Sequence, residues 1–133
     1  MHLAVSPAFR RWLLILYWIM MFLATHWPDI DRYAPERVRS LPHLDKMVHC
    51  GMYLGWMLMW GWVLTVAGRR ITASAMVWLL VGGAAWGIWD ELSQAFVARQ
   101  PSVGDFACDV AGLTVGLILL TVWINRRTPP RTA

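Results

Sequence analysis

The sequence from residue 44 to residue 67 reads LDKMVHCGMYLGWMLMWGWVLTVA, a long apolar run with a polar start. It is long enough for a helix that crosses a bilayer, which needs about 20 apolar residues. Asp45, His49 and Tyr53 recur every four positions, so a helix places them on one face. The stretch therefore predicts a membrane-spanning helix with polar side chains near one end.

Three further apolar stretches lie at roughly 9–27, 72–92 and 105–124. The chain has 133 residues and is 58% hydrophobic and 15% charged, whereas about a quarter of a soluble domain is charged. We therefore predict an all-α fold, a four-helix transmembrane bundle that forms a single membrane domain over 1–133, with a disordered tail over 126–133. The composition excludes a nucleic-acid-binding module, a disulfide-stapled secreted domain and a soluble nucleotide-binding fold.

The charged residues are divided between the two sides of this predicted bundle. One side carries seven basic residues and no acid, namely Arg10, Arg11, Arg69, Arg70, Arg126, Arg127 and Arg131. The other side carries five basic residues and all eight acids. Basic residues favour the cytoplasmic side of a membrane, so both termini are predicted to be cytoplasmic. The first apolar run ends without a good signal-peptidase site, so we expect it to remain as an uncleaved span.

Three of the predicted spans contain two glycines separated by three residues. The pairs are Gly51/Gly55, Gly83/Gly87 and Gly112/Gly116. Such pairs form a smooth helix face that lets two backbones approach closely in lipid. The second, third and fourth spans are therefore predicted to pack tightly, with the first span at the periphery.

Ionisable residues inside the predicted spans gather at the outer side of the membrane. They are Asp45, His49, Asp90, Glu91, Asp105 and Asp109. A charged side chain at the centre of a bilayer costs about 2.5–3.5 kcal/mol on insertion scales. We therefore expect these groups to converge on a shared, water-accessible cavity, with Lys46 and Arg99 as counter-ions.

Two sets of candidate site residues follow from this arrangement. The candidates for acid–base catalysis are His49, Glu91, Asp105 and Asp109. The candidates for ligand binding are Asp45, Lys46, Tyr53, Asp90, Gln94, Arg99 and Ser102.

Two blocks of these residues resemble the VanZ-like family of small integral membrane proteins. The first block fits the pattern D-K-x-x-H-x-x-x-Y with Asp45, Lys46, His49 and Tyr53. The second block consists of Asp90, Glu91, Gln94, Phe96, Arg99, Ser102, Asp105, Asp109, Gly112 and Gly116. The blocks and the helices between them cover 45–116, over half of the chain. The chain departs from the family at Val97-Ala98, where many relatives have Pro-Gly, and at Asp109, which is often Asn.

The resemblance implies a multi-pass protein of the bacterial inner (cytoplasmic) membrane. The founding member of the family is linked to low-level teicoplanin resistance, and the family implies no general catalytic activity. We expect the polar site to bind or handle a membrane lipid or a lipid-linked cell-envelope component. No cofactor and no nucleic-acid partner are expected.

Other interpretations of the polar residues stay open. They could form a structural hydrogen-bond network that fixes helix register. A membrane-embedded hydrolase or transferase could use His49 with the carboxylates, although Ser93 and Ser102 lack an evident base. The chain could also act as an interaction partner of another membrane protein, or form a homo-oligomer.

A metal ion is not expected from the sequence, because only one histidine is well placed. His49 lies among the carboxylates, but His43 lies six residues earlier and can point elsewhere. His2 and His26 are expected to lie outside the cluster.

Overall fold

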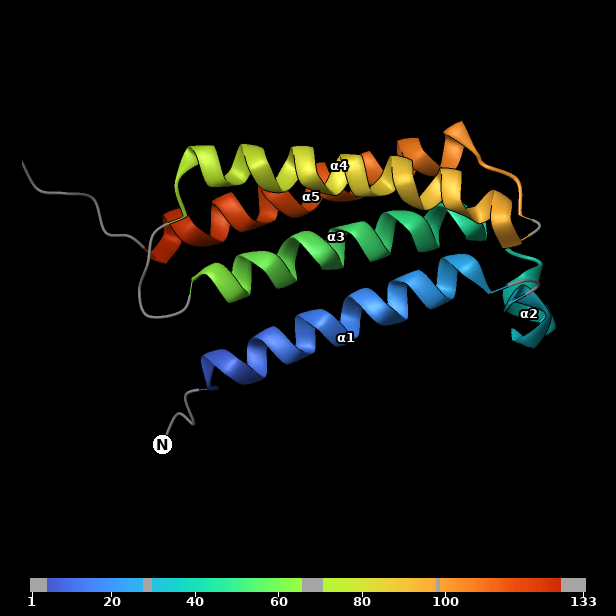
Figure 1. The fold of residues 1–133 in the computed structure, drawn as a ribbon, viewed down its shortest axis with the longest axis horizontal. Coiled ribbons are helices and arrows are strands. Elements are labelled where there is room, and N and C mark those ends of the chain that lie inside the picture. The colour runs from blue at the N-terminus through green and yellow to red at the C-terminus, as the bar shows by residue number, and fades with distance from the viewer. Residues whose placement is uncertain (1–4, 28–29, 66–70, 98, 128–133) are drawn as a thin grey trace, which may run out of the picture.

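The computed structural model describes residues 5–27, 30–65, 71–97 and 99–127 (Figure 1). The long helices are α1 (Pro7–His26), α3 (Leu44–Leu64), α4 (Ala73–Gln94) and α5 (Val103–Arg127). Short helical turns lie in the connections, namely η1 (Ile30–Tyr33), α2 (Glu36–Arg39) and η3 (Ala95–Val97). The described residues contain no strand, so the all-α prediction is confirmed.

The predicted spans and the observed helices agree closely. The stretches 9–27, 72–92 and 105–124 correspond to α1, α4 and α5. The second span begins at Leu44 as predicted, and α3 ends at Leu64. Residues 66–70, which include the predicted end of this span at residue 67 and the basic pair Arg69 and Arg70, lie outside the described residues. Helix α5 continues through Arg127, so the prediction of a tail from residue 126 was wrong for its first two residues, and 128–133 lie outside the described residues.

Short polar side chains begin three of the long helices. The Ser6 hydroxyl accepts from the Phe9 N–H at 3.2 Å, and Pro7 takes the first helical position of α1. The Thr72 hydroxyl accepts from the Ala75 N–H at 3.2 Å at the start of α4. The Ser102 hydroxyl accepts from the Asp105 N–H at 3.2 Å at the start of α5. These contacts satisfy N–H groups that the first turn of a helix leaves free.

The long helices lie side by side and alternate in direction along the chain (Figure 1). As a result, α1 and α4 end, and α3 and α5 begin, at the same end of the molecule, next to α2. We call this the polar end, because the predicted site residues lie there. The start of α1 and the end of α5 lie at the opposite end.

Helices α3 and α5 make the most extensive contact in the molecule, and glycines of α5 allow it. A Cβ at Gly112 would overlap the backbone of Cys50 and Leu54, and a Cβ at Gly116 would lie 2.8 Å from Cβ of Met57. The tight packing predicted from this glycine pair is therefore confirmed. Gly51 differs, because a Cβ there would meet nothing within 4 Å.

Helix α1 packs against α3 and α4 rather than against α5. The Tyr17 hydroxyl occupies the space left by Gly55 and donates to the Met52 carbonyl oxygen at 2.7 Å. Trp18 stacks on Trp86, with ring centroids 4.5 Å apart. Aromatic side chains therefore hold α1 against the bundle. Its contact with α3 is more extensive than the contact between α3 and α4, so the prediction that the second and third spans pack tightly together was wrong.

Much of the outer surface is apolar. Two helical segments, Pro7–His26 and Val103–Arg126, are long and apolar enough to cross a membrane by length and composition. Only 17% and 28% of their most apolar windows are buried inside the molecule. Large apolar side chains also face outward from the other long helices, for example Met47 and Trp78. These surfaces hint at a membrane protein.

Candidate functional site

The alternating helix directions gather the predicted site residues at the polar end. Helix α3 supplies residues 45–53 from its first turns, and α5 supplies Asp105 and Asp109 from its own start. Helix α4 supplies Asp90, Glu91 and Gln94 from its last turn. Side chains more than 40 positions apart in the sequence can therefore meet.

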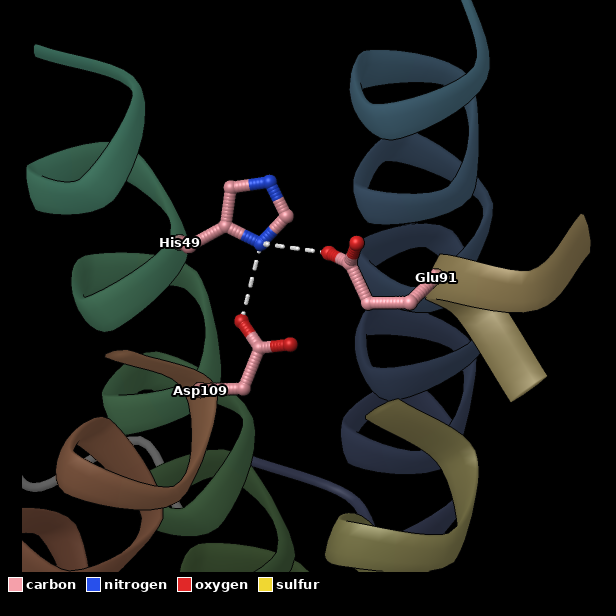
Figure 2. Close-up of side chains that lie close together, drawn as sticks. All are labelled: His49, Glu91 and Asp109. Carbon is pink, nitrogen blue, oxygen red and sulfur yellow. Dashed lines mark hydrogen bonds and ion pairs between the residues drawn. The ribbon is translucent and has the colours of Figure 1, made fainter. Parts of the chain in front are cut away.

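Three of these side chains form what we call the central group: His49, Glu91 and Asp109 (Figure 2). Nδ1 of His49 lies 2.9 Å from Oδ1 of Asp109 and 3.8 Å from Oε1 of Glu91. The three residues are 3%, 5% and 0% exposed in chain order. Each comes from a different helix, so the group exists only when α3, α4 and α5 are packed together.

Several buried polar atoms in and near the central group have no hydrogen-bond partner among the described residues. They are the Tyr53 hydroxyl, Oδ2 of Asp90, Oε1 of Glu91, Nε2 of Gln94 and Oδ2 of Asp109. Nearly all buried polar atoms in proteins are paired, and an unpaired one costs about 1–3 kcal/mol. The polar end therefore offers hydrogen-bond donors and acceptors that a bound polar group can pair with.

Gly87 of α4 leaves room beside the central group. A Cβ at this position would lie 3.3 Å from Oδ2 of Asp109 and 3.4 Å from the Tyr53 hydroxyl. Both of these polar atoms therefore line the small space that the missing side chain leaves.

A network of ion pairs and hydrogen bonds links the surface to the central group. Nζ of Lys46 lies 3.1 Å from Oδ2 of Asp45 and 3.0 Å from Oδ1 of Asp105. The Ser102 hydroxyl accepts from the Asp105 N–H at 3.2 Å, and the Ser102 N–H donates to Oε2 of Glu91 at 2.7 Å. Asp45 is exposed and Glu91 is buried, so the network, which we call the rim, runs inward from the surface.

A second polar group joins α1 to α4. The Thr25 hydroxyl donates to Oδ1 of Asp90 at 2.9 Å. Nδ1 of His26 lies 3.6 Å from the same oxygen, and Nε2 of His26 lies 2.8 Å from the Ser93 hydroxyl. Nη1 of Arg99 donates to the Thr25 carbonyl oxygen at 2.7 Å. Asp90 and Glu91 are adjacent in α4, so their side chains point about 100° apart around the helix axis. Asp90 therefore contacts α1, whereas Glu91 belongs to the central group.

The neighbours of His26 indicate how its protons are placed. Nδ1 lies 3.1 Å from the Phe22 carbonyl oxygen, which can only accept. When that bond forms, Nδ1 carries the proton of the neutral ring and Nε2 accepts from Ser93. The Ser93 hydroxyl also lies 2.9 Å from the Asp90 carbonyl oxygen, so its one proton has two acceptors.

The sequence prediction of a convergent site agrees with part of this geometry. The structure brings His49, Glu91 and Asp109 together and pairs Lys46 with Asp105. One expectation was wrong for the described part of the chain, because Arg99 binds the main-chain carbonyl oxygen of Thr25 there rather than a carboxylate. The packed helices bury the central group, and the shared, water-accessible cavity stays a prediction.

Two further corrections concern α1 and the end of α4. His26 was expected outside the cluster, but it contacts Asp90 and Ser93. Ser93 therefore has a base within hydrogen-bond distance, which sequence reasoning had not given it. Thr25 was not a candidate at all. The available signal was its position one residue before His26 in an otherwise apolar run.

Comparison with known proteins adds no assignment to this geometry: no family model, no curated protein and no solved structure matches the chain. The VanZ-like resemblance therefore stays a prediction that depends on the two residue blocks given above.

Proposed function

We propose that this chain is a VanZ-like integral protein of the bacterial cytoplasmic membrane whose four long helices all cross the bilayer. Helix α3 has 21 residues, which at 1.5 Å per residue gives about 31 Å, close to the roughly 30 Å hydrocarbon core. The outward-facing apolar side chains on all four long helices support this proposal. In water such an extensive apolar surface would drive aggregation.

We further propose that the polar end faces outward and binds the head group of a lipid-linked envelope component. The observation that carries this proposal is the rim itself. It runs from the surface inward to the central group, at one end of a bundle whose outer surface is largely apolar. Lys46 lies in the rim, is about one third exposed and pairs with Asp105 and with the exposed Asp45. An anionic head group can take the place of Asp45 as the second partner of Nζ.

Apolar side chains beside the rim support an amphiphilic ligand. Leu92, Phe96 and Val103 lie at the end of α4, in η3 and at the start of α5, and all three are strongly exposed. An acyl or isoprenoid chain can lie against these side chains while its head group reaches Lys46. A ligand without an apolar chain would leave this surface uncovered.

Native mass spectrometry of the full chain in detergent, with added polyprenyl phosphate, tests this function. We expect the wild type to retain the lipid and Lys46→Ala to lose most of it. Arg37→Ala is the matched control, since it removes one positive charge from the exposed helix α2. Equal retention by Lys46→Ala and the wild type, or no retention by either, would contradict the proposal.

A membrane-embedded hydrolase is the second candidate function, because the Ser93 hydroxyl lies 2.8 Å from Nε2 of His26. Oδ1 of Asp90 lies near the same ring, 3.6 Å from Nδ1, beyond hydrogen-bond distance. A hydroxyl next to an imidazole base is the arrangement that activates a serine nucleophile. A fluorophosphonate probe should then label the wild type and leave Ser93→Ala unlabelled. Ser102→Ala, which changes a serine whose hydroxyl caps α5, is the control. Equal labelling of all three proteins would exclude this function.

A further inference from the structure

We propose that the central group binds one divalent transition-metal ion, with Zn²⁺ as the best-fitting ion. The inference goes beyond head-group binding and does not depend on it. His49, Glu91 and Asp109 each offer a ligand atom, and these atoms all lie within 4.8 Å of one another. Imidazole nitrogen and carboxylate oxygen are ordinary zinc ligands.

Two of the three distances between ligand atoms of the central group are close to those of a metal centre, and the third is at most 4.8 Å. Tetrahedral zinc with bonds of about 2.0–2.2 Å holds its ligand atoms about 3.3–3.6 Å apart. The two distances from Nδ1 of His49, 2.9 Å and 3.8 Å, lie on either side of this range. Figure 2 shows both carboxyl groups turned toward the same ring nitrogen.

Charge balance also favours a cation in the central group. With both carboxyl groups ionised, even a protonated His49 leaves a net charge of −1 in a buried site. The nearby cation Lys46 is paired with Asp105 and Asp45 at the rim. Burial makes an uncompensated charge costly. A divalent ion bound to neutral His49 and two ionised carboxylates gives the central group a net charge of zero.

The unpaired oxygens are the independent observation that points to a ligand. Oε1 of Glu91 and Oδ2 of Asp109 are buried and have no hydrogen-bond partner among the described residues. Oε2 of Glu91 accepts from the Ser102 N–H, which holds the carboxylate in place and leaves Oε1 directed at His49. Residues outside the first set of ligands commonly orient metal ligands in this way.

The donor set also selects the class of metal. Three protein ligands with a nitrogen donor suit zinc, whose fourth position then takes water or another small ligand. Mg²⁺ and Ca²⁺ prefer six or more oxygen ligands, so two carboxylates and an imidazole suit them poorly.

Metal analysis of the purified full chain tests this inference. The protein is stripped with a chelator, incubated with Zn²⁺ and desalted, and the bound metal is counted by plasma mass spectrometry. We expect about one zinc per wild-type chain. No lipid is added, so failure here is distinguishable from failure of head-group binding.

Glu91→Gln is the decisive variant. The glutamine carbonyl oxygen can still accept from the Ser102 N–H, whereas its NH₂ group cannot bind zinc. We expect the zinc affinity to fall by at least about 100-fold, since loss of even an outer-shell partner costs 10–100-fold. Glu36→Gln removes an exposed carboxylate of α2, outside the central group and the rim, and should bind zinc like the wild type.

X-ray absorption distinguishes this centre from zinc bound at another histidine. The zinc in the wild type should show one imidazole and two carboxylate ligands, and His49→Gln should lose the imidazole signal. Circular dichroism checks that each variant is folded. A folded wild type that binds no zinc, or a Glu91→Gln variant that binds as tightly as the wild type, would overturn the inference.

Discussion

At the residue scale, the buried carboxylates of the polar end depend on very few donors. Asp90 is 1% exposed, and its Oδ1 receives the Thr25 hydroxyl at 2.9 Å. Its Oδ2 has no hydrogen-bond partner among the described residues. The Thr25 hydroxyl, together with the Gln94 side chain and His26, therefore makes this buried group tolerable.

Thr25→Val tests this dependence, because valine has nearly the shape of threonine and no hydroxyl. We expect a loss of about 1–3 kcal/mol of folding free energy, the usual cost of leaving a buried polar partner unsatisfied. Thermal unfolding in detergent would show it as a lower Tm.

Thr114→Val is the matched control for that substitution. The Thr114 side chain is exposed, and its hydroxyl donates to the Val110 carbonyl oxygen of its own helix. Its Tm should stay close to that of the wild type. If both variants lose the same stability, the hydrogen bond to Asp90 has no special role.

The sequence could indicate part of the central group because a helix has a fixed period. The four-residue spacing puts His49 and Tyr53 on one face of α3, and Asp105 and Asp109 on one face of α5. The helical period places residues within one helix and does not say which face of α1 meets which face of α4. The contact between His26 and Asp90 depends on how the two helices are rotated, and the sequence does not give that rotation.

At the element scale, the contact between α3 and α5 depends on the absence of side chains. A Cβ at Gly112 would overlap the backbone of Cys50 and Leu54. Backbone atoms cannot move aside as the end of a flexible side chain can. This contact also holds His49 of α3 against Asp109 of α5.

Gly112→Ala is therefore expected to push α3 and α5 apart. Overpacking of a well-packed interior costs about 1–3 kcal/mol, so the Tm in detergent should fall. Gly51→Ala is the control, since a Cβ at Gly51 would meet nothing within 4 Å. A Gly112→Ala variant as stable as Gly51→Ala would show that the close approach is not needed.

Spacing alone could not tell which glycines serve the packing. All three pairs have the same pattern, yet Gly51 lies on an open face and Gly55 receives Tyr17 of α1. A glycine pair predicts a smooth surface. Which helix packs against that surface depends on the arrangement of all the helices, and the spacing of the glycines does not give that arrangement.

At the scale of the whole molecule, opposite ends carry different charges. The polar end holds the described acids of α3, α4 and α5, whereas Arg10 and Arg126 lie near the opposite end. Because basic residues favour the cytoplasmic side, this arrangement predicts that the polar end faces outward.

Cysteine labelling in intact cells tests this orientation. In a background with Cys50→Ser and Cys108→Ser, a Tyr33→Cys variant should react with a membrane-impermeant maleimide from outside. Tyr33 is 79% exposed and lies in η1 at the polar end. Val5→Cys, near the start of α1, should react only after the cells are permeabilised. The reverse pattern would invert the proposed topology.

The central group can assemble only late in synthesis, because its residues lie on three successive long helices. Asp109 lies 60 positions after His49, so the ribosome completes the first two ligands well before the third. Until α5 has been synthesised, the hairpin of α3 and α4 must keep His49 and Glu91 without their final neighbour. Assembly of this centre is thus a late event in biogenesis, and a nascent chain arrested before residue 109 cannot form it.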